Sequence, residues 1–517
     1  MRLFFFVFAA LLHADTYPRQ PGVDAIHYAF RLTLSDTTDE IVGVATVDLR
    51  FQLEGVKEVA LDLASPMTVT AVSDHTFQHT GNRLVIQLAS SPKIGERRRF
   101  KVSYHGVPGG GLRIMNNKYG ERTFFSENWP NQAQQWLPMI DHPYDKATSE
   151  FLITAPSHYQ VISNGLLIEE ADQGNGQRLT HWKQSVPIAS WLNAIGVAQF
   201  SVRHFGSAKG IQLSTWVYHQ DRTQGIATFD KPTIQAVEFF SDYVGPFAYE
   251  KLANVVAAGL NGGTEHASAI FYGEKSVTDK PATNLVYHEI AHQWFGDAVT
   301  ESDWDEVWLS EGFATYFTLL GVEHYEGRDS FVAGLKQSKA AIFELETKLP
   351  NTPIIHDNLS DMKKVLNRLI YQKGGWTLHM LRGIVGREVF QASIRDYYQQ
   401  FRDRNATTAD FRTVMEQHSG LQLSEFFDQW LRRPGVPVVE GDWQYNVATK
   451  KIEVSLRQTQ PGAVYVLPLE IGVGGVVSKI AMTGKTQRFE IASDKTPDSV
   501  ILDPNTWVLM KATFSAR

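Results

Sequence analysis

The sequence contains no cysteine among its 517 residues. This absence excludes disulfide bonds, a thiolate metal site, a cysteine nucleophile and lipid attachment through cysteine. Any bound metal must therefore use histidine and carboxylate ligands. The absence does not identify a cellular compartment, because a chain of this length can fold stably without disulfides in any of them.

The chain also lacks an excess of positive charge. It has 49 Lys and Arg against 56 Asp and Glu, a formal net charge of -7, and so provides no broad positive field for nucleic acid or anionic lipid. The composition, 43% hydrophobic and 20% charged, is that of a globular protein too long for a single core. We expect about two to four domains and no nucleic-acid partner. Nothing in the sequence indicates an oligomeric state.

A long hydrophobic segment is missing from the N-terminus as well. Arg2 precedes the apolar run from Leu3 to Leu12, and polar sequence begins at Asp15. The run is about half of the roughly 20 apolar residues that a bilayer span needs. We therefore predict a signal peptide over residues 1–14 rather than a membrane anchor or a buried strand. The protein is expected to be exported, secreted or periplasmic, without stable membrane insertion.

The fold class expected from periodicity is multidomain α+β. Strand-like alternation predicts an N-terminal antiparallel β domain over 15–207, and its cleanest examples are the apolar residues Ala45, Val47, Leu49, Phe51 and Leu53, with 30–34 and 84–88. After a strand at 213–218, helical spacing dominates to residue 437, at 233–244, 284–295, 306–325, 371–385 and 423–431. Two prolines, Pro434 and Pro437, end the last helix. Alternation at 452–456 and 464–466 then predicts a C-terminal β-sandwich over 438–517.

The strongest local pattern is a pair of histidines four residues apart. His288 and His292 would project from one face of a helix and present two imidazoles to one ion, with Glu289 beside them. Chance alone produces such a five-residue pattern in roughly a few of every hundred chains with this many histidines. The pattern therefore needs a third ligand and an open position before it indicates a zinc site.

Glu311 is the candidate for that third ligand. It lies nineteen residues after His292 in a segment where Trp308, Leu309 and Phe313 are apolar. Glutamates on helices are usually solvated, but this one is expected to face inward. A buried carboxylate without a cation costs several kcal/mol, so a metal ion would explain it.

These residues resemble the M1 family of zinc aminopeptidases. The family signature is an HExxH helix followed, after eighteen residues, by a Glu in a WLxEGFAxY setting, and here His288 to His292 and Trp308 to Tyr316 match it. The resemblance implies a thermolysin-like catalytic domain over 208–437. It also implies one zinc ion per chain, with His288, His292 and Glu311 as ligands and Glu289 as general base.

A second stretch is similar to the family's GxMEN exopeptidase motif. By this resemblance Glu265 binds the substrate's α-ammonium group, within the substrate-binding segment Gly262, Gly263, Thr264, Glu265 and His266. Thr264 replaces the family's Met, which lines the pocket for the first side chain, and His266 replaces its Asn. Read without the family, two glycines before a Glu are an ordinary turn.

Three further matches extend the resemblance over about residues 28–435. Tyr371 and Gly374 match the YxKG motif, which implies that Tyr371 hydrogen-bonds the developing oxyanion; a lone Tyr on such a helix is otherwise a packing residue. The segments 136–143 and 426–431 resemble signatures of the N-terminal domain and of the end of the catalytic part. Glu127, a short distance before the first of these, is the nearest candidate for a second amine-binding residue. The small C-terminal sandwich suits the short members without a large helical domain.

The expected function is hydrolysis of N-terminal amino acids from peptides with a free N-terminus. A thermolysin-like endopeptidase would share the zinc site but lack the amine-binding Glu265. An epoxide hydrolase is another alternative, although nothing in the sequence specifies a lipid tunnel. A catalytically inactive scaffold of the same fold is a third, but such proteins lose ligands or the base.

Overall fold

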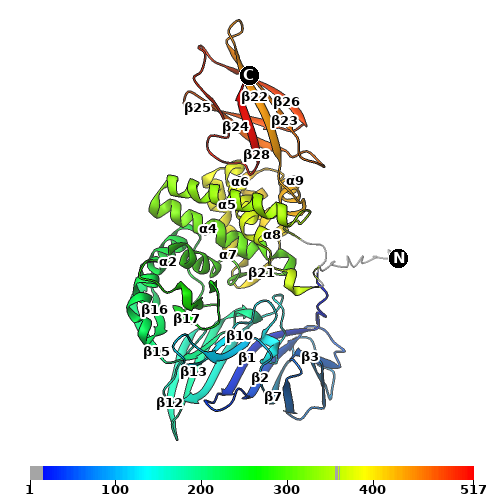
Figure 1. Ribbon diagram of the computed structural model, residues 1–517. Coiled ribbons are helices and arrows are strands. Elements are labelled where there is room, and N and C mark those ends of the chain that lie inside the picture. Colours follow the sequence, from blue (N-terminus) through cyan, green and yellow to red (C-terminus); the bar gives the residue numbers. More distant parts are fainter. Residues whose placement is uncertain (1–14, 356–358, 360) are drawn as a thin grey trace, which may run out of the picture.

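The computed structural model describes residues 15–355, 359 and 361–517. Three groups of elements lie one above another: strands at the N-terminal end, a mixed α/β group in the middle and strands at the C-terminal end (Figure 1). This arrangement confirms the predicted fold class. The predicted signal peptide, residues 1–14, lies outside the described residues.

The N-terminal group is built on a seven-stranded sheet. Its strands pair antiparallel except β1 and β10, which run parallel. Alternation in β2 buries Ala45, Val47, Leu49 and Phe51 on one face, as predicted from the sequence, whereas Leu53, predicted to continue this strand, lies beyond its end at Phe51 and is 49% exposed. In spatial order the sheet contains β12 (Leu166–Gly174), β13 (Gln177–Ala189), β10 (Lys146–Pro156), β1 (Val23–Thr33), β2 (Ile41–Phe51), β7 (Arg97–Gly106) and β4 (Met67–Val72).

Two smaller sheets complete this group. One contains β3 (Glu58–Asp62), β6 (Arg83–Gln87) and β5 (Phe77–Thr80). The other contains β11 (Gln160–Ser163), β14 (Ile195–Ala198), β9 (Arg122–Ser126) and β8 (Leu112–Asn116). The second sheet contacts the middle group, because Arg113 on β8 donates a hydrogen bond to the carbonyl of Gly259.

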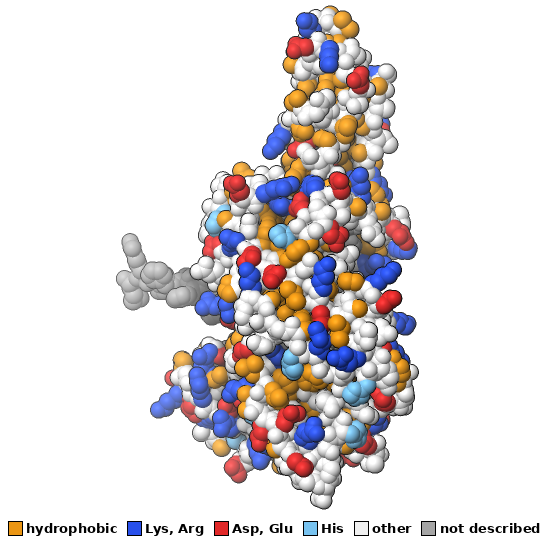
Figure 2. All heavy atoms as spheres, turned by 90° about the vertical axis from the view of Figure 1, so that its left-hand side faces the viewer, with side chains coloured by type: hydrophobic (Ala, Val, Ile, Leu, Met, Phe, Trp, Pro, Cys, Tyr) orange, Lys and Arg blue, Asp and Glu red, His pale blue; other side chains and the backbone are white. Residues whose placement is uncertain are grey.

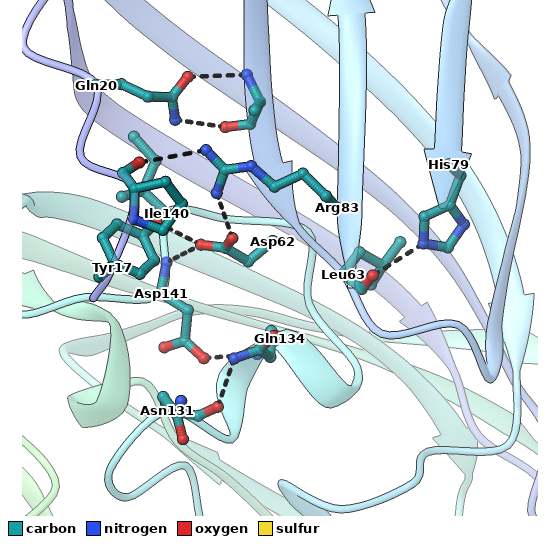
Figure 3. A network of polar contacts seen from close by, with 12 residues as sticks. Tyr17, Gln20, Asp62, Leu63, His79, Arg83, Asn131, Gln134, Ile140 and Asp141 are labelled. Carbon is teal, nitrogen blue, oxygen red and sulfur yellow. Dashed lines mark hydrogen bonds and ion pairs between the residues drawn. The ribbon is translucent and has the colours of Figure 1, made fainter. Parts of the chain in front are cut away.

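Residues 15–20, the first that the structure describes, form a strap along this N-terminal group (Figure 3). Asp62, at the end of β3, accepts hydrogen bonds from the Tyr17 hydroxyl at 2.5 Å and from Arg83 at 2.6 Å. The Gln20 amide pairs with both backbone groups of Ala60. Arg19 then reaches Asp303 of the middle group at 2.7 Å. The strap therefore ties the N-terminal strands to the segment that leads into helix α4 (Trp308–Glu326).

The middle group begins with a five-stranded sheet. Its order is β15 (Phe200–Ala208), β16 (Ile211–Tyr218), β17 (Lys251–Ala257), β19 (Ala269–Gly273) and β18 (Gly263–Thr264). The central strands β16, β17 and β19 are parallel, and every residue of β17 and β19 is buried. Parallel strands covered on both faces have this continuous burial. The short strand β18 forms one edge and carries Gly263 and Thr264.

Helices cover this sheet and carry most of the predicted site. The helices predicted at 233–244, 284–295, 306–325 and 371–385 all form, with ends shifted by a few residues. Among the described residues, no helix is long and apolar enough to cross a membrane. The elements are α1 (Arg222–Gly225), α2 (Lys231–Tyr243), α3 (Thr283–His292), β20 (Val299–Glu301), α4 (Trp308–Glu326), α5 (Arg328–Lys348), α6 (Arg368–Val385), α7 (Arg387–Phe401), β21 (Arg404–Ala406), α8 (Thr408–Ser419) and α9 (Ser424–Phe427), which a π-helix, Asp428–Arg432, continues.

The C-terminal group contains two small sheets. One has the order β26 (Thr486–Ala492), β23 (Lys451–Gln458), β22 (Val438–Asn446) and β28 (Lys511–Ala516). The other has β25 (Val476–Met482), β24 (Leu467–Val473) and β27 (Val500–Leu502). The group joins the middle one at α6, where His379 donates a hydrogen bond to the carbonyl of Thr506 at 2.9 Å and stacks on Trp507.

The strand predicted at 464–466 is wrong. These residues form a loop before β24, because side-chain amides take the backbone groups that a strand partner would need. Gln458 accepts a hydrogen bond from the Tyr465 N–H at 2.8 Å, and Gln429 accepts one from the Val466 N–H at 2.8 Å. Alternating hydrophobicity alone could not reveal these long-range partners.

One face of the molecule mixes charges of both signs. Figure 2 shows the side of the molecule that faces left in Figure 1, and on it Lys and Arg side chains are interspersed with Asp and Glu over all three groups. This even distribution matches the small excess of acidic residues in the sequence.

Candidate active site

Helix α3 carries the two histidines. Val286, Ile290 and Ala291 anchor it in the core, and His288 and His292, four residues apart, project from one face of the helix. The two Nε2 atoms lie 3.2 Å apart, and the His292 ring is almost completely buried. Two imidazoles one helical turn apart therefore converge on the same point.

Helix α4 adds Glu311 to this point. Trp308, Leu309 and Phe313 are all buried around it, and they hold the first turn of the helix against the core. Glu311 Oε2 lies 3.3 Å from His288 Nε2 and 3.2 Å from His292 Nε2. The structure thus brings the three residues together from two helices.

The three donor atoms have the spacing that a zinc ion requires. They form a triangle with edges of 3.2, 3.2 and 3.3 Å. Bonds of roughly 2.0–2.1 Å at tetrahedral angles separate neighbouring ligand atoms by about 3.3–3.4 Å. Two imidazoles and a carboxylate are also the donor types that zinc binds. The residues therefore fit a zinc ion with one position left for a further ligand.

Hydrogen bonds orient the ligands. His292 Nδ1 lies 3.3 Å from the Phe295 carbonyl and 3.0 Å from Ser310 Oγ. Since a carbonyl only accepts, Nδ1 carries the proton and Nε2 keeps its lone pair for a metal. Although burial opposes ionisation of Glu311, His292 and His288 lower the pKa of Glu311 to about 2. Ser310 was not predicted from the sequence, although its position directly before Glu311 was the available signal.

Tyr371 reaches the same point from α6. Its hydroxyl donates a hydrogen bond to Glu311 Oε1 at 2.6 Å, and its ring stacks on His288 with centroids 6.0 Å apart. Burial and then the charge of Glu311 raise the pKa of Tyr371. The phenol therefore stays protonated and can donate a hydrogen bond beside the metal ligands.

Gly262 and the strand β18 that follows it lie against Glu289. Gly262 has a φ of +80°, in the left-handed region that favours glycine. A methyl group on Gly263 would lie 2.4 Å from the Glu289 carboxyl carbon. The missing side chain at Gly263 thus leaves the space that the Glu289 carboxylate fills. Thr264, the next residue, pairs with Phe271 of β19 and is buried.

Glu265 completes a second cluster with Glu289 and His292. One ligand atom of each lies within 4.8 Å of the others, and all three residues are buried. Burial and then the charge of Glu265 raise the pKa of Glu289 well above its usual value. Burial also raises the pKa of Glu265, as does the charge of Glu311. Two carboxylates held so close in a buried site favour a cation between or beside them.

Gln293 holds this loop in place and was missed by sequence reasoning. Its amide nitrogen donates to the Glu265 carbonyl at 2.9 Å, and its oxygen accepts from the Ser268 N–H at 2.8 Å. Gln293 directly follows His292, so one turn joins the metal ligands to the loop. His266 is fully buried and packs edge-on against Phe271, and burial lowers the pKa of His266 to about 4. Its imidazole is therefore a neutral packing group.

Glu127 lies near this cluster but is paired. Its carboxylate forms an ion pair with Arg113 of β8, and its side chain is 25% exposed. The charge of Glu127 is close enough to raise the pKa of Glu265, after the larger effect of burial. The structure thus places Glu127 at the rim of the cluster, with a guanidinium as its partner.

Comparison with known proteins finds relatives among aminopeptidases. The chain is 26% identical to a glutamyl aminopeptidase of Bitis rhinoceros over 470 residues, which are 84% of this chain and 49% of that protein. It is 28% identical to the glutamyl aminopeptidase of Rattus norvegicus over 342 residues, 63% of this chain and 36% of that protein. The chain therefore spans half or less of the length of these curated relatives.

Solved structures share the fold. An M1 zinc metallopeptidase from Deinococcus radiodurans superposes with a TM-score of 0.70 at 24% identity, covering 80% of this chain and 94% of that one. Another structure from the same organism, a mutant bound to a Tyr-Ser-Ala substrate, has a TM-score of 0.69 at 24% identity and covers 81% and 96% of the two chains.

Family models match most of the N-terminal and middle groups. The model of the peptidase M1 N-terminal domain matches residues 24–192, and the model of the peptidase family M1 domain matches residues 230–430. Together they account for well over half of the chain, and the second contains the triangle of His288, His292 and Glu311. The chain belongs to peptidase family M1.

Proposed function

We propose that this protein is a zinc-dependent aminopeptidase that removes residues from the free N-termini of peptides. The observation that supports this most directly is the pairing of two clusters that share His292. The triangle with His288 and Glu311 suits a zinc ion, and Glu265 and Glu289 lie beside it. A carboxylate one residue's length from a hydrolytic metal site is what recognition of an N-terminal amine requires.

Charge balance favours an amine at this place. Burial and mutual repulsion raise the pKa values of Glu289 and Glu265, so cations are needed to keep these carboxylates and Glu311 all ionised, and a divalent ion balances only two of the three negative charges. A buried site of this kind is stabilised by one further positive group. The α-ammonium of a peptide supplies that charge, whereas the neutral backbone of an internal peptide segment does not. An exopeptidase therefore fits the site better than an endopeptidase.

Each residue of the site has its own role in the proposed hydrolysis. Zinc, when bound by His288, His292 and Glu311, polarises the scissile carbonyl and makes water a stronger acid. The Glu289 carboxylate accepts the proton of the attacking water and passes it to the leaving amine. The Tyr371 hydroxyl, which here donates to Glu311 Oε1, donates to the oxyanion that develops on the substrate. Glu265 holds the α-ammonium, so that cleavage follows the first residue.

The wider proposal rests on the relatives and on the sequence. The two curated relatives described above are glutamyl aminopeptidases, and one structural neighbour is bound to a Tyr-Ser-Ala substrate, so peptides are the proposed substrates. We propose one zinc ion per chain, export through a signal peptide over residues 1–14, and domains at 15–207, 208–437 and 438–517. Thr264 is proposed to help select the first side chain.

Paired substrates test the proposal. Purified protein is assayed with aminoacyl-anilides and with the same anilides carrying an N-acetyl group, before and after chelation and zinc addition. We expect the free-amine series to be hydrolysed much faster than the blocked series, with loss of activity with chelator and recovery with zinc. Equal hydrolysis of the blocked series would favour the endopeptidase. Activity unaffected by complete metal removal would exclude a metal-dependent reaction.

Replacing Glu265 by Gln should separate amine recognition from chemistry. Removing one partner of a buried ion pair costs roughly 3–5 kcal/mol, so kcat/KM for a free-amine anilide should fall at least about 100-fold. Hydrolysis of the N-acetylated anilide, which has no ammonium to bind, should change little. The measurement is kcat/KM for both substrates with the zinc content of each preparation.

The matched control is Glu238→Gln. Glu238 lies on α2 with its side chain exposed, so the same chemical change there should leave both rates within about twofold of wild type. A Glu265→Gln protein that lost activity equally on both substrates would place amine recognition elsewhere.

A further inference from the structure

Helices α4 and α6 touch through two glycines. A methyl group on Gly374 would lie 3.1 Å from the Gly312 Cα, and one on Gly312 would lie 3.0 Å from the Gly374 carbonyl carbon. Both neighbours are backbone atoms, which cannot turn away as a side chain does. The two helix backbones are therefore in direct contact at this point, so close that an added methyl group requires them to shift by a few tenths of an ångström.

This contact stands next to the reacting groups. Gly312 directly follows Glu311 on α4, and Gly374 lies one helical turn after Tyr371 on α6. The hydrogen bond between Tyr371 and Glu311, 2.6 Å long, spans the same two helices. The backbone separation at the glycine pair thus sets how far the phenol reaches toward the metal ligands.

Two further contacts fix the rest of the helix pair. The Tyr316 hydroxyl lies 3.2 Å from His379 Nδ1, and Glu323 accepts from Arg382 at 2.9 Å. Tyr316 and His379 are fully buried, and His379 is held in turn by the C-terminal group through Thr506. These contacts hold the far ends of α4 and α6 together. A side chain added at either glycine would therefore separate the two helices at the end that carries Tyr371.

We propose that Gly312 and Gly374 are positioning residues, which set the reach of the Tyr371 hydroxyl toward the metal centre by letting α4 and α6 touch. This inference rests on the proposed aminopeptidase function, in which Tyr371 binds the oxyanion. An added methyl group must move the backbones apart by a few tenths of an ångström to restore ordinary contact. A misplacement of 1 Å in a catalytic group costs roughly 100-fold in rate, so we expect about a 10-fold loss.

The test combines Gly374→Ala with Tyr371→Phe. Gly374→Ala alone should lower kcat about 10-fold, with KM within about twofold and a full complement of zinc. In the Tyr371→Phe background, where no hydroxyl remains to be positioned, the same change should alter kcat less than about twofold. If Gly374→Ala does not fold, Gly312→Ala makes the same contact from α4 and takes its place in the cycle.

A crystal structure of the zinc-free Gly374→Ala protein provides a readout without activity. The distance between Tyr371 Oη and Glu311 Oε1, 2.6 Å here, should lengthen by a few tenths of an ångström, to about 3 Å, which weakens the hydrogen bond. This measurement separates the two ideas: an inactive wild type would defeat the proposed function, whereas an unchanged distance would defeat this inference alone.

The control is the neighbouring glycine. A methyl group on Gly375 would lie 3.2 Å from the Thr315 side-chain methyl, which can shift by the small amount required. Gly375→Ala should therefore leave kcat within about twofold. Equal losses from Gly374→Ala with and without the Tyr371 hydroxyl, or an unchanged kcat in a folded Gly374→Ala protein, would overturn the inference.

Discussion

The Glu289→Gln variant is expected to lose about 10³- to 10⁴-fold in kcat on a free-amine anilide while keeping its zinc. A positioned general base contributes roughly 10²- to 10⁴-fold to such a reaction, and the amide of Gln cannot accept the proton. The Glu289 side chain is buried and lies directly against Gly263. A second water molecule therefore has little room to take over the role of the base. The expected loss therefore lies near the upper end of this range.

Two measurements make this expectation sharp. Zinc content should equal that of wild type, because Glu289 contributes no atom to the triangle of proposed zinc ligands. The Glu238→Gln protein controls for the loss of one negative charge at the surface. A Glu289→Gln enzyme with kcat within tenfold of wild type would remove the assignment of the base and leave the metal site intact.

The Glu311→Gln variant is expected to bind zinc far more weakly than wild type. Loss of a group that only supports a ligand costs roughly 10- to 100-fold in metal affinity, so loss of a ligand should exceed 100-fold. Its carboxylate also neutralises part of the metal charge, and the pKa of about 2 keeps it ionised at neutral pH. Activity at trace zinc should disappear, and excess zinc should restore it in part.

Zinc affinity is measured by competition with a chelator of known strength, and thermal unfolding provides a second reading. Zinc binds only the folded chain, so it should raise the unfolding midpoint of wild type and raise that of Glu311→Gln much less. Glu326→Gln, at the exposed end of the same helix, is the matched control and should behave as wild type. Wild-type affinity in Glu311→Gln would exclude this carboxylate as a ligand.

Most of what could be predicted from the sequence came from the spacing of residues within one or two helical turns. Two histidines four apart must share a face if the segment is a helix, and the apolar residues Val286 and Ile290 made it one. The same reasoning placed Glu311 on an inward-facing turn, because its neighbours Trp308 and Phe313 had to be buried. Each of these inferences needed only residues within one or two turns.

Contacts between distant segments were beyond that reasoning. Gln293 and Ser310 orient the site, yet each is an ordinary polar residue until its partner is known. The strand predicted at 464–466 was wrong because Gln429 and Gln458 occupy its backbone groups from elsewhere in the chain. The pairing of Glu127 with Arg113 could not be foreseen for the same reason.

The sequence by itself determined the secondary structure that carries the site and the chemical types of its ligands, since helical period and residue chemistry are local properties. Only the tertiary structure decided the distances between groups on different elements: the triangle of His288, His292 and Glu311, the approach of Glu265 to Glu289, and the contact of Gly312 with Gly374. The reason is that such distances depend on how buried surfaces pack across the whole domain. A change of a few tenths of an ångström there alters chemistry without altering any local pattern.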